Sequence, residues 1–439
     1  TIYFTVTSDE LSYNDSTAIH QVILNTVTHK DLSDFTIHWD NLHKKDKKQY
    51  SADISGDLIF SKGQPLNVKF DESTIVLNDS AYIITETSDI VVDTGYIWIK
   101  ELTLKSPTQS LIIEGRISKD PYDLVQISFN NVQASTFADI TKPYGIAAEG
   151  NINGYLLLSN LYKTPDYRSD INITQFAVNG NYVGDAIIQS SWDHERQAVY
   201  SEAYIEYSGN VGKNVPFEIK GFYNPRDRDN ALDLHVKLDR FNLALVEPYL
   251  SSFSSHLSGS CDGNIDISGS LDRPDVDGSI TFRRTNMKVD YLNMYYSFAH
   301  TLTISNTSIA MKDVIINDMN GKTAKGDFEL KHNHFKDFYL DLSLNPQNMQ
   351  FLNTTASDNK YFYGKAYASG QVNIYGPFKQ IQIDVIAKSE PGTVVYIPIT
   401  GADEVDESNF ITFVSESSDT NRTLDVKTES SGVAVDFAF

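Results

Sequence analysis

Three short segments bring together residue types that could carry catalytic or metal chemistry. Cys261 lies in Gly259-Ser-Cys261-Asp-Gly263, a thiol between two glycines, as in the elbow that exposes a nucleophile. That elbow needs a strand-to-helix turn and a histidine base, whereas the glycine here opens a strand. Ala148 and Ala368 fill the position of Cys261 in two related segments. We therefore expect a small, buried, apolar residue.

The other two segments contain histidine and carboxylate side chains. His332-Asn-His334 could place two imidazoles on one strand face near Asp337, but a zinc site needs three or four converging ligands. We expect a turn at a strand end. Asp193-His194-Glu195 could serve acid–base chemistry, yet it lies between strands and is predicted to be a solvated hairpin tip. The sequence has no P-loop, dinucleotide fingerprint or paired-cysteine motif, and we expect no catalytic residue, no metal and no cofactor.

Short glycine-marked strand segments recur along the chain. Gly115, Gly221 and Gly326 lie 106 and 105 residues apart, and the sequences around them are alike. A second set marks Gly150, Gly263 and Gly370, at spacings of 113 and 107 residues. We interpret these six as glycines at which the strands bend or approach closely. One supersecondary unit that is repeated and stacked usually makes a long surface rather than a single active site.

The composition narrows the possible partners. The chain has 25 Tyr, 23 Phe and a net charge of −22, which is typical of a β-rich acidic protein. This charge argues against nucleic acid, which needs clustered Lys and Arg, and against docking on anionic lipid headgroups. A single cysteine excludes an internal disulfide. No apolar run approaches the ~18–20 residues of a membrane span. Both ends alternate like strands, so we expect a piece of a longer protein whose membrane anchor lies outside this chain.

Apolar and polar residues alternate with a period of two almost everywhere, which predicts antiparallel strands with one apolar and one wetted face. We expect helix only in residues 242–253 and in the comparable residues 132–140 and 349–354. The predicted lining of the apolar face is Ile97, Ile99, Leu102, Leu104, Val125, Ile127, Phe129, Leu232, Leu234, Val236, Leu238, Ile265, Ile267, Leu340, Leu342, Leu344, Val372, Ile374, Ile381, Ile383 and Val385.

The second half of the chain resembles a known family. Tyr361-Phe-Tyr-Gly-Lys-Ala-Tyr-Ala-Ser-Gly370, Pro391-Gly-Thr-Val-Val-Tyr-Ile-Pro398 and Phe410-Ile-Thr-Phe-Val414 are similar to the C-terminal region of TamB, the translocation and assembly module subunit, in its Bacteroidetes-type form. Residues 255–415 carry the specific match. TamB proteins resemble AsmA-like and bridge-like lipid transfer proteins.

The resemblance implies a fold and a set of partners. The fold is all-β: a long, U-shaped antiparallel β-sheet, the β-taco groove, with repeats of about 106 residues and short helical caps. We expect residues 1–439 to form one continuous groove, with repeats at 50–154, 155–269 and 270–376 and partial repeats at 1–49 and 377–439. The implied location is the periplasm, with an anchor in the inner membrane. The implied partners are phospholipids and an outer-membrane barrel protein of the TamA or BamA kind.

Physical reasoning leads to the same class of function. Roughly 25 strands spaced about 4.8 Å apart would make a sheet on the order of 120 Å long. Its apolar face must pair with another sheet, close into a barrel or hold something apolar, because large exposed apolar patches are rare. The first hypothesis is a non-enzymatic lipid-transfer conduit. The alternative is a periplasmic scaffold that assists outer-membrane barrel assembly or translocation by pairing with unfolded strands. An extracellular solenoid would have much shorter repeats.

Overall fold

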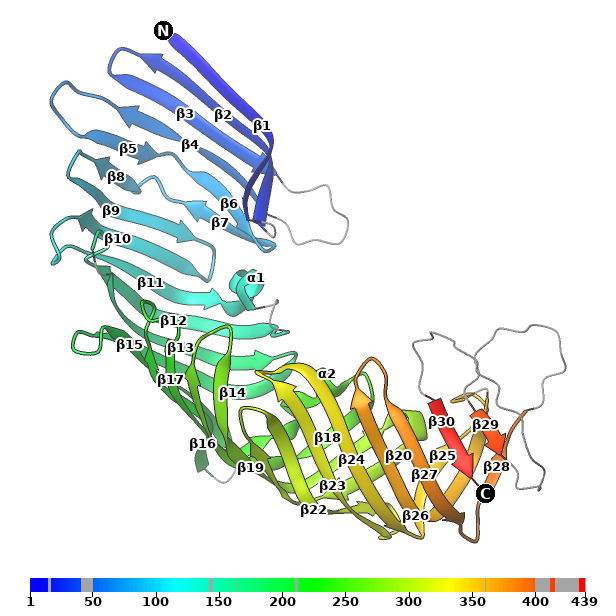
Figure 1. Ribbon diagram of the computed structural model, residues 1–439. Helices are drawn as coiled ribbons and strands as arrows, with labels where there is room; N and C mark the ends of the chain where they lie inside the picture. The colour runs from blue at the N-terminus through cyan, green and yellow to red at the C-terminus, as the bar shows by residue number, and fades with distance from the viewer. Residues whose placement is uncertain are drawn as a thin grey trace. The chain divides into compact units, whose positions relative to one another are not determined.

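The computed structural model describes residues 1–14, 17–40, 50–141, 145–163, 165–209, 212–359, 361–398, 411–414 and 434–438. Almost all regular structure in these residues is β-strand, and neighbouring strands pair antiparallel with few exceptions (Figure 1). The exceptions among the described pairings involve β30, Ala434–Ala438, which runs parallel to β27, Gln382–Ser389, and to β29, Ile411–Val414. The predicted all-β antiparallel fold is confirmed.

The chain divides into two compact units. The first contains residues 1–215 and 220–223, and the second contains residues 216–219 and 224–439. Strand β16, Gly212–Tyr223, contributes residues to both units. The predicted repeat boundaries and the continuity of one groove along the whole chain stay predictions.

The first unit is a ladder of strands in which each long strand pairs with the next one along the chain. Its strands are β1 Ile2–Asn14, β2 Thr17–His29, β3 Leu32–Asp40, β4 Ser51–Ile59, β5 Leu66–Phe70, β6 Ser73–Leu77, β7 Ser80–Ile84, β8 Asp89–Val92, β9 Tyr96–Lys105, β10 Ser110–Ser118, β11 Leu124–Gln133, β12 Ala148–Ser159, β13 Asp166–Val178, β14 Asn181–Asp193 and β15 Ala198–Gly209. Between β4 and β9 the ladder is split into two narrow halves. One half runs through β5 and β8, and the other runs through β6 and β7.

The second unit follows the same scheme. Its strands are β17 Leu232–Asn242, β18 Ser254–Gly269, β19 Pro274–Val289, β20 Met294–Phe298, β21 Thr301–Ile304, β22 Ser308–Asp318, β23 Thr323–Asn333, β24 Lys336–Gln347, β25 Met349–Thr354, β26 Tyr363–Pro377, β27, β28 Val394–Tyr396, β29 and β30. Again two short strands share one long partner. Both β20 and β21 pair with β19 and with β22, while β24 and β25 pair with different halves of β26.

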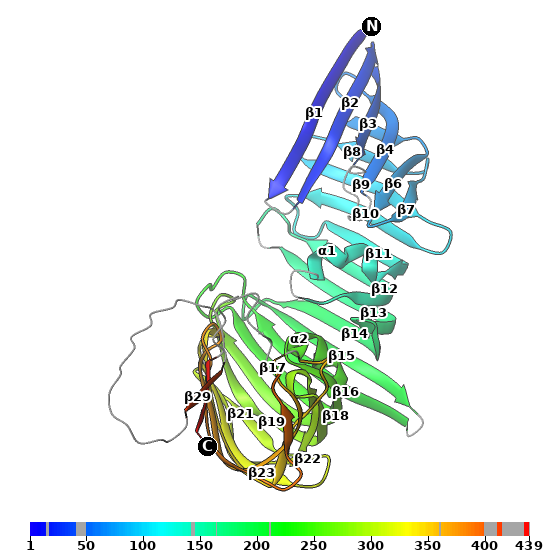
Figure 2. The same cartoon turned by 90° about the vertical axis from the view of Figure 1, so that its right-hand side faces the viewer.

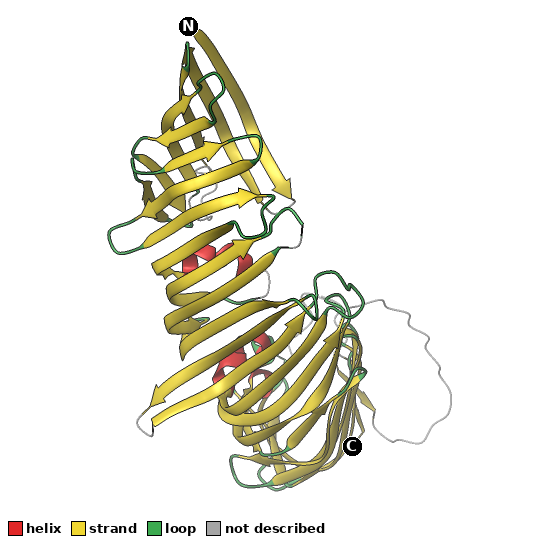
Figure 3. Ribbon diagram, turned by 90° about the vertical axis from the view of Figure 1, so that its left-hand side faces the viewer, coloured by secondary structure: helices red, strands yellow, loops and turns green. Residues whose placement is uncertain are grey.

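Short helical segments interrupt each ladder. In the first unit η1, Ala134–Phe137, leads into α1, Ala138–Thr141, and in the second η3, Leu243–Val246, leads into α2, Glu247–Leu250. A further turn, η4, covers Asp290–Leu292. Figures 2 and 3 show α1 beside the strands of the first unit and α2 beside those of the second. The helical predictions for residues 132–140 and 242–253 are confirmed for these segments.

The helical prediction for residues 349–354 is wrong, because these residues form strand β25. The reason lies in the neighbouring strand. β24 pairs with β26 only from Val372 to Pro377, so the first half of β26 needs another partner for its backbone groups. β25 supplies it, with Met349 opposite Ala368 and Thr354 opposite Gly364.

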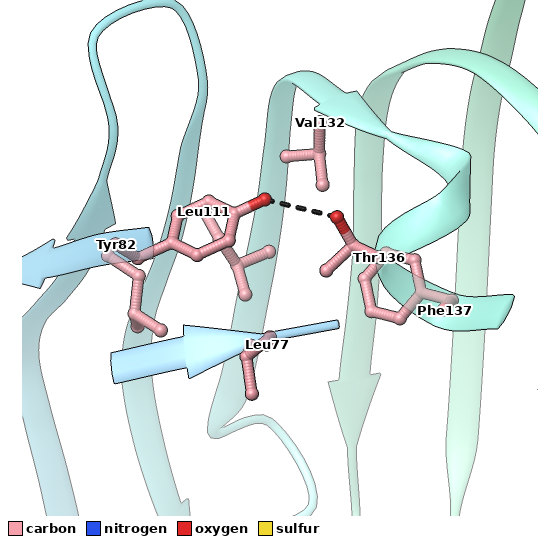
Figure 4. A pocket seen from close by; sticks show the side chains of 7 residues that line it. Leu77, Tyr82, Leu111, Val132, Thr136 and Phe137 are labelled. Atoms are coloured by element: carbon pink, nitrogen blue, oxygen red, sulfur yellow. Dashed lines mark hydrogen bonds between the residues drawn. The ribbon is translucent and has the colours of Figure 1, made fainter. Parts of the chain in front are cut away.

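The best-packed cores lie where a helical segment or a short hairpin covers the sheet. In the first unit Tyr82 is buried with Ile84 and Leu104, and Leu77 and Leu111 pack around them. Figure 4 shows the hydroxyl of Tyr82 directed towards Thr136 of η1, with an oxygen–oxygen distance of 3.2 Å. The same hydroxyl donates a hydrogen bond of 2.8 Å to Gln109 Oε1. The contact with Thr136 fixes η1 against the split part of the ladder, and the bond to Gln109 joins Tyr82 to the turn between β9 and β10.

Candidate functional site

The second unit presents a continuous aliphatic face built from cross-strand pairs. On β17 and β18, Leu234 pairs with Ile267 and Val236 pairs with Ile265. Farther along the chain, Leu342 of β24 pairs with Ile374 of β26. Directly opposed residues point to the same side of a sheet. The predicted residues that share this second apolar face are Leu232, Leu234, Val236, Leu238, Ile265, Ile267, Leu340, Leu342, Leu344, Val372, Ile374, Ile383 and Val385.

Intervening strands carry this face from β18 to β24. Residues outside the predicted lining fill these positions. Their pairs are Ile280 with Leu302, Ile304 with Ile309, and Ile309 with Leu330, which pairs in turn with Leu340. Ile381 lies one residue before β27 and is half-buried, so no described strand pair places it on the face.

The first unit has an equivalent face. Leu104 lies in line with Leu111 and Phe129, and Leu102 lies in line with Ile113 and Ile127. The predicted residues on this first apolar face are Ile97, Ile99, Leu102, Leu104, Val125, Ile127 and Phe129, with Leu156 and Leu158 added by β12. The pairs Ile97/Ile99 and Leu102/Leu104 are out of phase in the sequence. A register shift in β9 between Ile99 and Leu102 returns both pairs to one face.

The two apolar faces are partly accessible. Val125, Val236 and Leu104 are 4%, 7% and 8% exposed, and the other predicted lining residues in the strands are half-buried. None of them is among the exposed large hydrophobic side chains. The half-buried side chains of these rows therefore keep part of their apolar surface accessible to solvent. This is the exposure expected of a face that can receive a further apolar group.

Charged side chains on the same strands point the other way. On β17, Asp233, His235 and Lys237 alternate with the leucines of the second apolar face. His235 Nδ1 lies 2.7 Å from Asp266 Oδ1 on β18, and these two residues pair across the strands. The alternation therefore separates an aliphatic side of the sheet from a charged side, as an antiparallel sheet with one wetted face requires.

The helical segment η3–α2 covers one margin of the second apolar face. Asn242 initiates it, because its side chain accepts a hydrogen bond of 3.1 Å from the Ala244 N–H. Leu243 is buried against Leu257 and Cys261, and Val246 and Leu250 pack on this group. The covered margin is therefore a small dry core, whereas the rows through Leu234 and Val236 lie outside this cluster.

Cys261 belongs to that dry core. The side chain is 3% exposed, and burial, with a smaller effect of the Asp262 carboxylate, raises the pKa of the thiol to about 11. The thiol is therefore protonated at neutral pH and packs as a small apolar group. The expectation of a buried apolar residue at this position is confirmed.

The histidine segments are also explained by local structure. His332 is 7% exposed, stacks on Phe335 at 4.4 Å and accepts a hydrogen bond from the Phe335 N–H at the end of β23. Burial lowers its pKa, and His334 adds a smaller lowering. His194 lies in the turn between β14 and β15, 3.2 Å from Asp166. The predicted strand-end turn and hairpin tip are both confirmed. Among the described residues, no three His, Cys, Asp or Glu side chains are grouped to hold a metal ion.

All six marked glycines lie within strands, and close backbone approach is seen at five of them: Gly115, Gly150, Gly263, Gly326 and Gly370. Gly115 lies in β10 with φ of 126°, and a Cβ atom there would overlap the carbonyl oxygen of Leu124. A Cβ at Gly326 in β23 would likewise overlap the carbonyl oxygen of Ser343. The other four are Gly150 in β12, Gly221 in β16, Gly263 in β18 and Gly370 in β26. Their role as bend points stays a prediction.

The strands contain a recurrent bulge that the sequence analysis did not predict. At each bulge a polar side chain on the neighbouring strand, next to a glycine, accepts a hydrogen bond from a backbone N–H. In β17 the register shifts between Leu238 and Phe241, and Arg240 adopts φ of 52°. Its N–H donates a 2.8 Å hydrogen bond to Asp262 Oδ1, opposite the bulge. Similar bonds join Asn131 to Asn153 at 2.9 Å, Gln175 to Asp185 at 2.9 Å, Asp313 to Asp327 at 2.7 Å and Asn348 to Ser369 at 2.8 Å.

Each acceptor of this set is adjacent to a glycine. The glycines are Gly154, Gly184, Gly263, Gly326 and Gly370. In each of the four strands where the bulge shifts the register, the apolar residues change from a spacing of two to a spacing of three, as at Leu238 and Phe241. That change of spacing, together with a polar residue beside a strand glycine, is the signal that could have identified the bulges.

Comparison with known proteins adds one finding for the second unit. The family model of the TamB C-terminal domain matches residues 312–437, which include β23 to β28. No curated protein and no solved structure matches the chain. Within the described residues, no helix has the length and apolar character needed to cross a membrane. The resemblance inferred from the sequence is therefore confirmed for this part of the chain: residues 312–437 are similar to the TamB C-terminal domain.

Proposed function

We propose that the two apolar faces bind the acyl chains of phospholipids and that the protein transfers lipid without catalysing a reaction. The observation that carries this proposal is the in-register alignment of half-buried aliphatic side chains over many strands, such as Leu342 with Ile374 and Ile383. An acyl chain laid along such a row removes apolar surface from water, which favours binding by about 25 cal/mol per Å².

The TamB C-terminal domain supports a role in the bacterial envelope, in assembly of the outer membrane. We further propose that the protein acts in the periplasm, that a segment outside this chain anchors it in the inner membrane, and that an outer-membrane barrel protein of the TamA or BamA kind receives the lipid. The separation of aliphatic and charged sides supports this proposal, because it leaves a wetted exterior around an apolar path.

A photo-crosslinking side chain at Leu342 tests the proposal directly. Placed on the second apolar face, it should form adducts with phospholipid in cells. The matched control is Gln371, which is exposed on the neighbouring strand and pairs with Ile386 on the opposite side. A crosslinker there should give little or no lipid adduct. Adducts with polypeptide in place of lipid at Leu342 would contradict the conduit and favour a scaffold for unfolded barrel strands.

A further inference from the structure

The first apolar face changes character on β13, β14 and β15. One of its rows runs through Leu102, Ile113, Ile127 and Leu156 in β9 to β12. In the next three strands the same row consists of Ser169, Ser190 and Ser201, which are paired in register. The corresponding rows of the second apolar face, as defined above, contain no hydroxyl side chain.

These hydroxyls have hydrogen-bonding capacity that the described part of the chain does not use. Ser190 Oγ and Ser201 Oγ lie 2.9 Å apart, so one of their two protons is shared between them and the other remains. Ser169 is 8% exposed and its hydroxyl makes no hydrogen bond to another described residue. A polar group surrounded by apolar side chains is costly unless it finds a partner. The row therefore offers donors to an acceptor that lies on the face.

Aromatic rings border the serine row on the side of the hairpin turns. Tyr167 and Trp192 occupy the next position outward on β13 and β14, and their ring centroids lie 6.4 Å apart. The Tyr167 hydroxyl also makes no hydrogen bond within the described residues. Rings with one polar atom suit a boundary between apolar and wet surroundings.

On the inner side of the row lie isoleucines. Ile171 and Ile188 form the next in-register pair. Across the strands the face thus passes from aromatic to hydroxyl to aliphatic. Charges are directed elsewhere, because Arg168 and Asp170 alternate with Ser169 and lie on the opposite side of β13.

We propose that the serine row is a subsite for the glycerol-ester region of a diacyl lipid. Ser169 and one of the paired hydroxyls of Ser190 and Ser201 donate hydrogen bonds to the two ester carbonyl oxygens, and the acyl chains lie inward over Ile171 and Ile188. Neutral donors match neutral ester acceptors, and the aromatic border lies on the headgroup side. The inference rests on the proposed lipid-binding function. It adds to that function a subsite that holds a bound lipid in one orientation.

Trp192 provides the reporter for a test. Replacing Trp39 and Trp98 with Phe leaves Trp192 as the only tryptophan of the full chain. Its fluorescence is then measured with phosphatidylcholine that carries a nitroxide quencher either near the ester end or near the methyl end of one acyl chain. We expect stronger quenching by the ester-end label. Equal quenching, or stronger quenching by the methyl-end label, overturns the subsite.

A second measurement uses the hydroxyls themselves. Ser169→Ala, Ser190→Ala and Ser201→Ala combined should weaken phosphatidylcholine binding about tenfold, the loss expected for two neutral hydrogen bonds. Ser191→Ala is the control, because Ser191 pairs with Arg168 and Tyr200 on the opposite side of β14. Unchanged affinity in the triple variant overturns the subsite and leaves the proposed function intact. Absence of quenching by both lipids, with no lipid bound, overturns the proposed function as well.

Discussion

Cys261 shows at the scale of a single residue how the surroundings of a side chain determine its protonation state and reactivity. The thiol is surrounded by Leu243 and Leu257 and faces no described base, so burial keeps it protonated. Its equivalence with Ala148 and Ala368 was sufficient to predict its packing, because a position that accepts alanine demands small size rather than reactivity. The leucine rows were predictable for a similar reason, since period-two alternation fixes which side chains share a face.

The raised pKa of Cys261 predicts a pH dependence of stability. The thiol has its ordinary pKa near 9.0 when unfolded and a pKa of about 11 when folded. Below pH 9 both states keep the proton, so the contribution of the buried thiol is complete. Between about pH 9 and about pH 11 only the unfolded thiol ionises, so stability is lost as pH rises.

Urea unfolding of the wild type and of Cys261→Ala across this window checks the prediction. The tyrosines titrate in both proteins. The difference between the two free energies of unfolding therefore gives the contribution of the thiol alone to the pH dependence of stability. The wild type should lose stability relative to the variant as the pH rises. A difference in the free energy of unfolding that stays constant with pH would show that the thiol already ionises in the folded protein with its ordinary pKa.

At the scale of elements, the capped bulges determine where each strand changes phase. They could not be read from residue types alone, because the positive φ angles fall on Asn131, Gln175, Arg240 and Asp313 rather than on glycine. The error at residues 349–354 has a related cause. The hydrophobic spacing there allows a helix, but the backbone groups of β26 require a strand partner, and single-segment patterns do not contain that requirement.

Asp262 provides a test of the capped bulge. Asp262→Ala removes the acceptor of the Arg240 N–H and the partner of Arg283, and should cost about 1 kcal/mol, as loss of a side-chain cap does at a helix end. Asp262→Asn should recover part of this loss, because an amide oxygen can still accept the N–H. The free energy of unfolding from urea titration gives both values.

The matched control is Asp266→Ala on the same strand. Asp266 pairs with His235 at the exposed surface, so its loss should cost about 0.5 kcal/mol or less. Urea unfolding of the wild type at low pH provides a second check. The hydrogen bond from Arg240 is the largest cause that lowers the pKa of Asp262, so its stabilising contribution should be lost as the pH falls below the ordinary value of 3.8. Equal costs for Asp262→Ala and Asp266→Ala would contradict the capping role.

At the scale of the whole molecule, the chain combines acidic character with aliphatic faces. The net charge of −22 keeps such a protein dispersed, while each unit keeps an aliphatic side, which we propose binds acyl chains. The sequence could predict the fold class and which side chains of one strand share a face, because the period-two alternation can be recognised without knowledge of tertiary contacts. That these faces line a lipid groove stays a prediction. It could not predict the serine row, because Ser169, Ser190 and Ser201 come from three strands and align only through their register.

The measurement that tests lipid binding most directly is native mass spectrometry of the gently purified full chain, with extraction of any bound lipid. We expect phospholipid to co-purify with the wild type, and less of it to co-purify when Leu234→Asp and Leu342→Asp place charges on the second apolar face and leave the first face unchanged. An unchanged amount of lipid on the folded double variant would exclude the second apolar face as a binding surface. A mass without lipid from well-folded wild-type protein would contradict the conduit itself.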